Sequence, residues 1–131
     1  MDESGWKRKI VKEINEAGGY ALRIEDKHAV GRLDTLIVVP REPTVFMVEF
    51  KIVRGGAFGP TPRQYEEGKQ IERRGYPLLP VLAGVIDDDR IMVAYWCKIV
   101  RWASESEWAG IAKNTAEFMD LLRTVGKSYA R

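Results

Sequence analysis

Residues 44–53, TVFMVEFKIV, constrain the fold more than any other part of this chain. Their apolar side chains are almost continuous rather than alternating, which is typical of a strand that is covered on both faces in the middle of a sheet. Glu49 and Lys51 interrupt this run near its end, where burying an unpaired charge is costly. Because side chains two apart on a strand point the same way, this pair shares one face and Phe50 points into the opposite layer.

Length and composition fit one folded domain over residues 1–131. The chain is 45% hydrophobic and 31% charged, enough for a core of its own. Cys97 is the single cysteine and His28 the single histidine, which excludes an internal disulfide framework and a thiolate zinc site. We expect no membrane segment and no signal peptide, hence a cytoplasmic protein. The net charge of +2 neither requires nor excludes a nucleic-acid partner.

The other segments predict an α/β fold with a mixed sheet. Apolar spacing predicts a helix over residues 4–17, which Gly18 and Gly19 end. Strands are expected at 20–24 and 33–39, a helix at 62–74 behind the N-cap Thr61, and a hairpin of strands 80–86 and 90–96. The three aspartates 87–89 fit the turn of that hairpin better than a second metal site.

A last helix is expected after residue 103, where Ser104 and Glu107 have the spacing of a capping box. One stripe of this helix would contain Trp108, Ile111, Thr115, Phe118, Met119 and Leu122, and Gly126 would lie just past its end. The predicted order is therefore α-β-β-β-α-β-β-α, a mixed sheet with helices packed on it.

Asp34 stands at the start of the strand over residues 33–39, and a short proline-rich turn should place this strand antiparallel to the central one. Two carboxylates brought close together repel each other, and a divalent cation bound between them relieves that repulsion. Oxygen ligands suit Mg²⁺ or Mn²⁺, and Lys51 on the same face could hold a water or stabilise charge on a phosphate. Together these predict a metal-dependent phosphodiesterase. The alternative is a structural ion pair of Glu49 with Lys51, and an Asp34 that only caps its strand.

Three ordered motifs resemble the VRR-NUC group, the virus-type replication-repair nucleases of the PD-(D/E)xK superfamily. They are G-x-x-D ending at Asp34, E-x-K from Glu49 to Lys51, and P-x-Q ending at Gln64. The resemblance spans about residues 3–85 and departs at Leu33, where the pattern usually has proline or serine. It implies a restriction-endonuclease-like αβββαβ core over about residues 3–86, followed by a C-terminal extension, a strand and a helix, over about 87–131.

The resemblance also assigns roles to residues. It implies that Asp34, Glu49, the backbone carbonyl of Phe50 and Glu3, early in the first helix, hold Mg²⁺ or Mn²⁺. Lys51 would be the catalytic lysine. Gln64 would point its amide at the metal site, although Thr61 and Gln64 also form a capping box by themselves. Candidates for binding DNA phosphates, or else plain surface, are Arg54, Arg63, Lys69, Arg73 and Arg74, with His28 in a loop near the site.

The implied function is a structure-selective DNA endonuclease resembling Holliday-junction resolvases, acting as a homodimer through its apolar C-terminal region in a phage or prokaryotic cell. Two alternatives stay open. One is a flap, nick or restriction-type nuclease with the same chemistry, because the site residues do not define the substrate. The other is a catalytically silent module that binds branched DNA.

Overall fold

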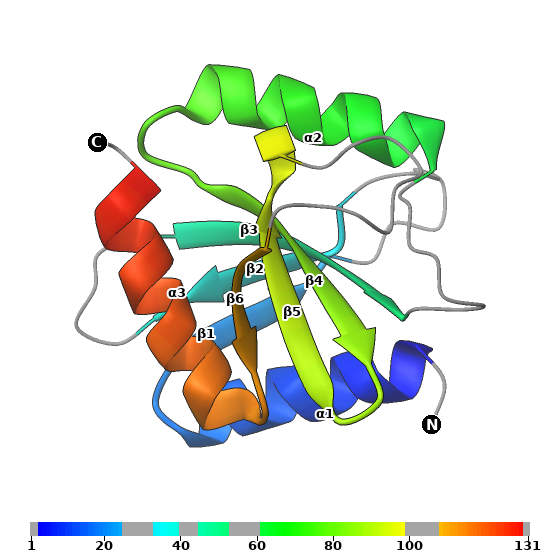
Figure 1. Cartoon of the computed structure of the whole chain (residues 1–131), viewed down its shortest axis with the longest axis vertical. Coiled ribbons are helices and arrows are strands. Elements are labelled where there is room, and N and C mark those ends of the chain that lie inside the picture. The colour runs from blue at the N-terminus through cyan, green and yellow to red at the C-terminus, as the bar shows by residue number, and fades with distance from the viewer. Residues whose placement is uncertain (1–2, 25–32, 40–44, 53–60, 99–107, 130–131) are drawn as a thin grey trace.

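The computed structural model describes residues 3–24, 33–39, 45–52, 61–98 and 108–129. Their six strands form one sheet in the order β1-β2-β3-β4-β5-β6, with helices on both faces (Figure 1). The helices are α1 (Glu3–Glu16), α2 (Pro62–Gly75) and α3 (Thr115–Tyr129). The strands are β1 (Tyr20–Arg23), β2 (Thr35–Val38), β3 (Val45–Ile52), β4 (Val81–Asp87), β5 (Arg90–Tyr95) and β6 (Trp108–Ala112), and a short 3₁₀ turn, η1 (Trp96–Lys98), follows β5.

The sheet is mixed, and its one parallel pair lies at the centre. β3 runs parallel to β4, and the chain crosses between them through α2. The pairs β1–β2, β2–β3, β4–β5 and β5–β6 are antiparallel. The predicted α/β fold with a central strand at residues 44–53 is therefore confirmed, with β3 between β2 and β4.

Two apolar cores lie on opposite faces of this sheet. The face toward α1 and α3 buries Phe50, whose ring centroid is 5.7 Å from that of Phe118. Gly84 is paired with Phe50 across β3 and β4, and a Cβ at Gly84 would come 2.7 Å from the Phe50 ring. The face toward α2 buries Trp96 together with short side chains of β4 and β5. Phe50 thus occupies the layer opposite to α2, as its place between Glu49 and Lys51 predicted.

α2 packs directly on the indole of Trp96. The indole Nε1–H donates a hydrogen bond to the backbone carbonyl of Tyr65 at 3.1 Å. A Cβ built on Gly68 would lie 2.7 Å from Cζ2 of Trp96 and nearer still to Nε1 and Cε2. The absence of a side chain at Gly68 therefore sets how closely the helix approaches the sheet.

The predicted end of α1 and the predicted hairpin are both confirmed. Gly18 follows α1 with φ of 91°, a left-handed conformation that suits glycine at a helix end. β4 and β5 form the hairpin, with Asp87 paired with Arg90 and Asp88 at φ of 54°. In the described part of the chain, no helix is long and apolar enough to span a bilayer.

The helix predicted after residue 103 is wrong over its first part. Trp108–Ala112 is strand β6, paired with β5 along the sheet edge. α3 begins at Thr115, because Asn114 caps it: its Oδ1 accepts from the backbone N–H of Glu117 at 2.9 Å. Gly126 lies inside α3 rather than beyond it. Ser104 and Glu107 fall outside the described residues.

Candidate active site

β2 and β3 bring the two predicted carboxylates to the same end of the sheet. Their register pairs Thr35 with Val48, so that Asp34, directly before β2, is level with Glu49. Val48 is buried in the core toward α1 and α3, so Glu49 faces the side on which α2 lies. Asp34 precedes β2 and contacts Lys7 of α1.

Glu49 is almost completely buried, with 1% of its surface exposed. Its Oε1 accepts a hydrogen bond from Nε2 of Gln64 at 3.0 Å, and Nζ of Lys51 lies 3.6 Å from the same oxygen. A buried carboxylate needs such donors to stay ionised at tolerable cost. The two side chains that the sequence placed around Glu49 are therefore both in contact with it.

The side-chain amide of Gln64 forms hydrogen bonds both within the cap of α2 and with Glu49. Its Oε1 accepts from the backbone N–H of Thr61 at 3.0 Å, and Oγ1 of Thr61 accepts from the backbone N–H of Gln64 at 3.1 Å. This is the predicted capping box at the start of α2. The capping box is thus confirmed, and Nε2 of the same amide also donates to Glu49. Its role in chemistry stays a prediction.

Asp34 is held by α1, a contact that the sequence did not reveal. It forms an ion pair with Lys7, and its Oδ1 accepts a hydrogen bond from Oγ1 of Thr35 at 2.8 Å. Lys7 follows Glu3 by four residues, so the two share a face of α1. Glu3 begins α1, but its side chain lies outside the described residues. The spacing of Lys7 from Glu3 was the one signal that could have drawn attention to it.

The donor set of this end of the sheet fits a hard divalent cation. Asp34 and Glu49 supply carboxylate oxygens, and Mg²⁺ needs no more than one or two of these because it retains waters. Among the described residues, no three acidic, histidine or cysteine side chains gather into one cluster. Lys7 and Lys51 balance the two carboxylates. A cation would therefore compete with Lys7 for Asp34.

The polar side chains at this end of the sheet differ in exposure. The side chain of Asp34 is 17% exposed and that of Lys51 is 20% exposed, whereas Glu49 is 1% exposed. Asp34 and Lys51 are therefore the more solvent-accessible members of the site.

Four of the predicted phosphate-binding residues lie on α2, from Arg63 in its first turn to Arg74 in its last. Arg63, Arg73 and Arg74 are exposed, and Nζ of Lys69 lies 5.4 Å from the ring centroid of Tyr65. Arg54, His28 and Gly31 lie outside the described residues. The structure thus joins Glu49 to Lys51 and Gln64 by contacts and places Asp34 level with Glu49 at the same end of the sheet.

Comparison with known proteins gives a likeness of fold. No protein-family model matches the chain, and no curated protein sequence does. The structure is similar to that of Archaeoglobus fulgidus Hjc, a Holliday junction resolvase from an archaeal hyperthermophile. The TM-score is 0.60 and the sequence identity 14%, with 80% of this chain and 84% of that chain covered. The predicted restriction-endonuclease-like arrangement, a mixed sheet flanked by helices, is thereby confirmed as a fold.

Proposed function

We propose that this chain is a Mg²⁺- or Mn²⁺-dependent deoxyribonuclease that cuts branched DNA. The observation that supports the proposal is the contact of buried Glu49 with Lys51 and Gln64, with Asp34 level with Glu49 at the same end of the sheet. The likeness to a Holliday junction resolvase supports the choice of a four-way junction as substrate. Under this proposal, residues 1–131 form one nuclease domain of the VRR-NUC group of the PD-(D/E)xK superfamily. The protein would act in the cytoplasm of a phage-infected or prokaryotic cell.

Each side chain has a distinct part in the proposed reaction. A divalent cation held by Asp34, Glu49 and the Phe50 carbonyl, with Glu3 as a further ligand, would activate water and offset phosphate charge. Lys51 holds its ammonium group beside Glu49, where it can position the attacking water or stabilise negative charge on a phosphate oxygen. Gln64 fixes the orientation of Glu49 through its hydrogen bond, and Lys7 fixes Asp34 through its ion pair.

The decisive experiment compares four-way junction, flap, nicked and linear duplex DNA in Mg²⁺, Mn²⁺ or EDTA. We expect junction cleavage by the wild type, with a loss of at least about 10²-fold in Asp34→Asn and Lys51→Ala. Asp120→Asn on α3 and Lys12→Ala on α1 are matched controls, because both side chains are exposed. Full activity in Asp34→Asn would refute the assignment. Preference for flaps or nicks would favour the second nuclease class, and binding without cleavage would favour the silent module.

A homodimer is part of the proposal, since two strands of a junction must be cut. Within the C-terminal region expected for it, Phe118, Met119 and Leu122 are buried in the chain's own core and are not available for such a contact. β1 instead exposes Tyr20 and Leu22, with Ile24 following on the same face. We therefore place the dimer contact there.

Sedimentation at working concentration tests this contact. Leu22→Glu should shift the protein toward monomer and turn paired junction cleavage into single nicks. Leu78→Glu is the matched control, because Leu78 is also an exposed leucine but lies beyond α2. A wild type that is monomeric throughout would contradict the dimer.

A further inference from the structure

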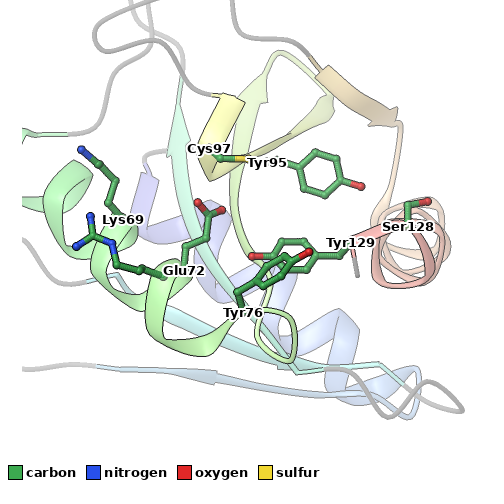
Figure 2. Close-up of a pocket in the computed structure, with 8 residues that line it drawn as sticks. Lys69, Glu72, Tyr76, Tyr95, Cys97, Ser128 and Tyr129 are labelled. Atoms are coloured by element: carbon green, nitrogen blue, oxygen red, sulfur yellow. The ribbon is translucent and has the colours of Figure 1, made fainter. Parts of the chain in front are cut away.

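A cavity of about 670 Å³ lies at the far end of α2 from the carboxylates, between α2, the end of β5 with η1, and the end of α3. Figure 2 shows three tyrosines gathered in it, Tyr76, Tyr95 and Tyr129, with the carboxylate of Glu72 turned toward Cys97. Its volume is within the range of small-molecule pockets. None of its lining residues belongs to the candidate active site.

The aromatic side chains of the cavity form a stacking surface. The ring centroids of Tyr129 and Tyr95 are 6.1 Å apart, with an interplanar angle of 28°. Those of Tyr129 and Tyr76 are 5.5 Å apart, with an angle of 54°. Rings of this kind bind flat π systems, and nucleobases stack on them whatever their sequence. A flat heterocycle is therefore the shape that this surface would accept.

Two polar atoms in the cavity are buried without a hydrogen bond among the described residues. They are Oε2 of Glu72 and the hydroxyl of Tyr129. Such atoms are rare in folded proteins because each costs free energy, and they often mark a place where a bound group is accepted. One is an acceptor and the other can donate as well, so together they match the hydrogen-bonding edge of a base.

The electrostatics of the cavity agree with this match. Burial raises the pKa of the Glu72 carboxyl, although its hydrogen bonds from the backbone and thiol of Cys97 oppose the rise. Burial, followed by the nearby Glu72, raises the pKa of the Tyr129 phenol to about 12. A neutral, hydrogen-bonding ligand is thus better suited to the inner wall than a second anion. Lys69 and Arg73 also line the cavity and supply cations for a ligand's phosphate.

We propose that the cavity binds one unpaired nucleotide of a DNA strand, with its base against the tyrosines and Glu72, and its phosphates beside Lys69 and Arg73. This inference rests on the proposed nuclease function. Lys69, Glu72, Arg73 and Tyr76 form one stripe of α2, with the i, i+3, i+4, i+7 spacing of a single helix face. Glu72 follows Gln64 by eight residues, or about 12 Å along the helix axis at 1.5 Å per residue. A base displaced from a duplex near the cut can therefore reach the cavity along this stripe.

The test measures binding of labelled single-stranded and duplex oligonucleotides by fluorescence anisotropy in EDTA, with the full-length chain. Tyr76→Ala should weaken single-strand binding by about tenfold and leave duplex binding unchanged. Ile111→Ala is the matched control, because Ile111 is 50% exposed and Tyr76 57% exposed, and Ile111 does not line the cavity. Glu72→Gln should reduce any preference for bases with an exocyclic amine over thymine.

The outcomes separate this inference from the nuclease proposal. Binding in EDTA does not depend on cleavage, so a loss of selective single-strand binding in Tyr76→Ala supports the cavity even if the metal site fails. Competition by free nucleoside monophosphates, without any effect of Tyr76→Ala on oligonucleotides, would show a site for free nucleotides and overturn the strand assignment. Equal losses for single strand and duplex, or none, would also overturn it.

Discussion

Gly68 lies where α2 crosses the indole of Trp96, and Gly68→Ala should lower the free energy of unfolding. The added Cβ would overlap the indole, which is buried and hydrogen-bonded to the carbonyl of Tyr65. Alanine would normally stabilise a helix relative to glycine, so the expected sign is opposite to that of an ordinary helical substitution. The overlap with Trp96 is the reason.

The expected change in the free energy of unfolding combines two costs and one gain. Overpacking a well-packed site costs about 1–3 kcal/mol. Displacing the indole weakens its hydrogen bond to Tyr65, a further cost of about 1 kcal/mol. The gain in helix propensity offsets about 1 kcal/mol. We therefore expect Gly68→Ala to destabilise the protein by about 2 kcal/mol, a large part of the stability of a small domain.

Urea denaturation of a double-mutant cycle measures this effect. Trp96→Phe gives a smaller ring, so Gly68→Ala should cost less in that background than in the wild type. Glu66→Ala, at an exposed position of the same helix, should change stability by less than about 0.5 kcal/mol. A Gly68→Ala protein as stable as the wild type, or equal costs in both backgrounds, would refute the reasoning.

Three further predictions concern the helix cap, the sheet and the cavity. Thr61→Ala should lower the free energy of unfolding, measured by urea denaturation, by about 1 kcal/mol, because it removes only the helix cap. Gln64→Leu should lower it by about 2–3 kcal/mol, because it also removes a hydrogen-bond donor from the buried carboxylate of Glu49. Gly84→Ala should cost about 1–3 kcal/mol in the same assay, since its Cβ would overlap the ring of Phe50. The pKa of Tyr129 is raised to about 12 in the folded protein, against about 10 in the unfolded chain. Between these pH values unfolding releases the phenol proton, so the free energy of unfolding should fall as the pH rises from about 10 to about 12. Denaturation across these pH values, with phenolate absorbance followed in parallel, should show a smaller fall for Tyr129→Phe; equal falls would contradict the assignment.

Much of the fold could be predicted from local patterns. The continuous apolar run around Glu49 indicated a strand covered on both faces, and the structure places β3 at the centre of the sheet. The predicted start of the C-terminal helix was wrong because two residues, Ser104 and Asn114, both fit an N-cap with a glutamate three residues later. Pairing with β5 makes Trp108–Ala112 a strand, and that contact is between segments distant in sequence. Spacing within the segment carries no information about it.

The candidate site was predictable where alternation and register define it. The relative placement of Asp34, Glu49 and Lys51 was inferred from two antiparallel strands and a period of two, and Gln64 was assigned by the P-x-Q motif of the resemblance. The ion pair of Lys7 with Asp34 did not follow, because it depends on which turn of α1 lies against the end of the sheet. The cavity around Tyr129 was equally hidden, since its walls come from three elements that only the tertiary structure brings together.

The shared amide of Gln64 makes the first turn of α2 and the carboxylate of Glu49 thermodynamically interdependent. A ligand that favours one position of α2 must therefore change the binding free energy of a ligand at Glu49. By reciprocity, a ligand at Glu49 changes the binding free energy at α2 by the same amount. Contacts made along the basic outer surface of the helix and events at the buried acid are therefore coupled through one side chain.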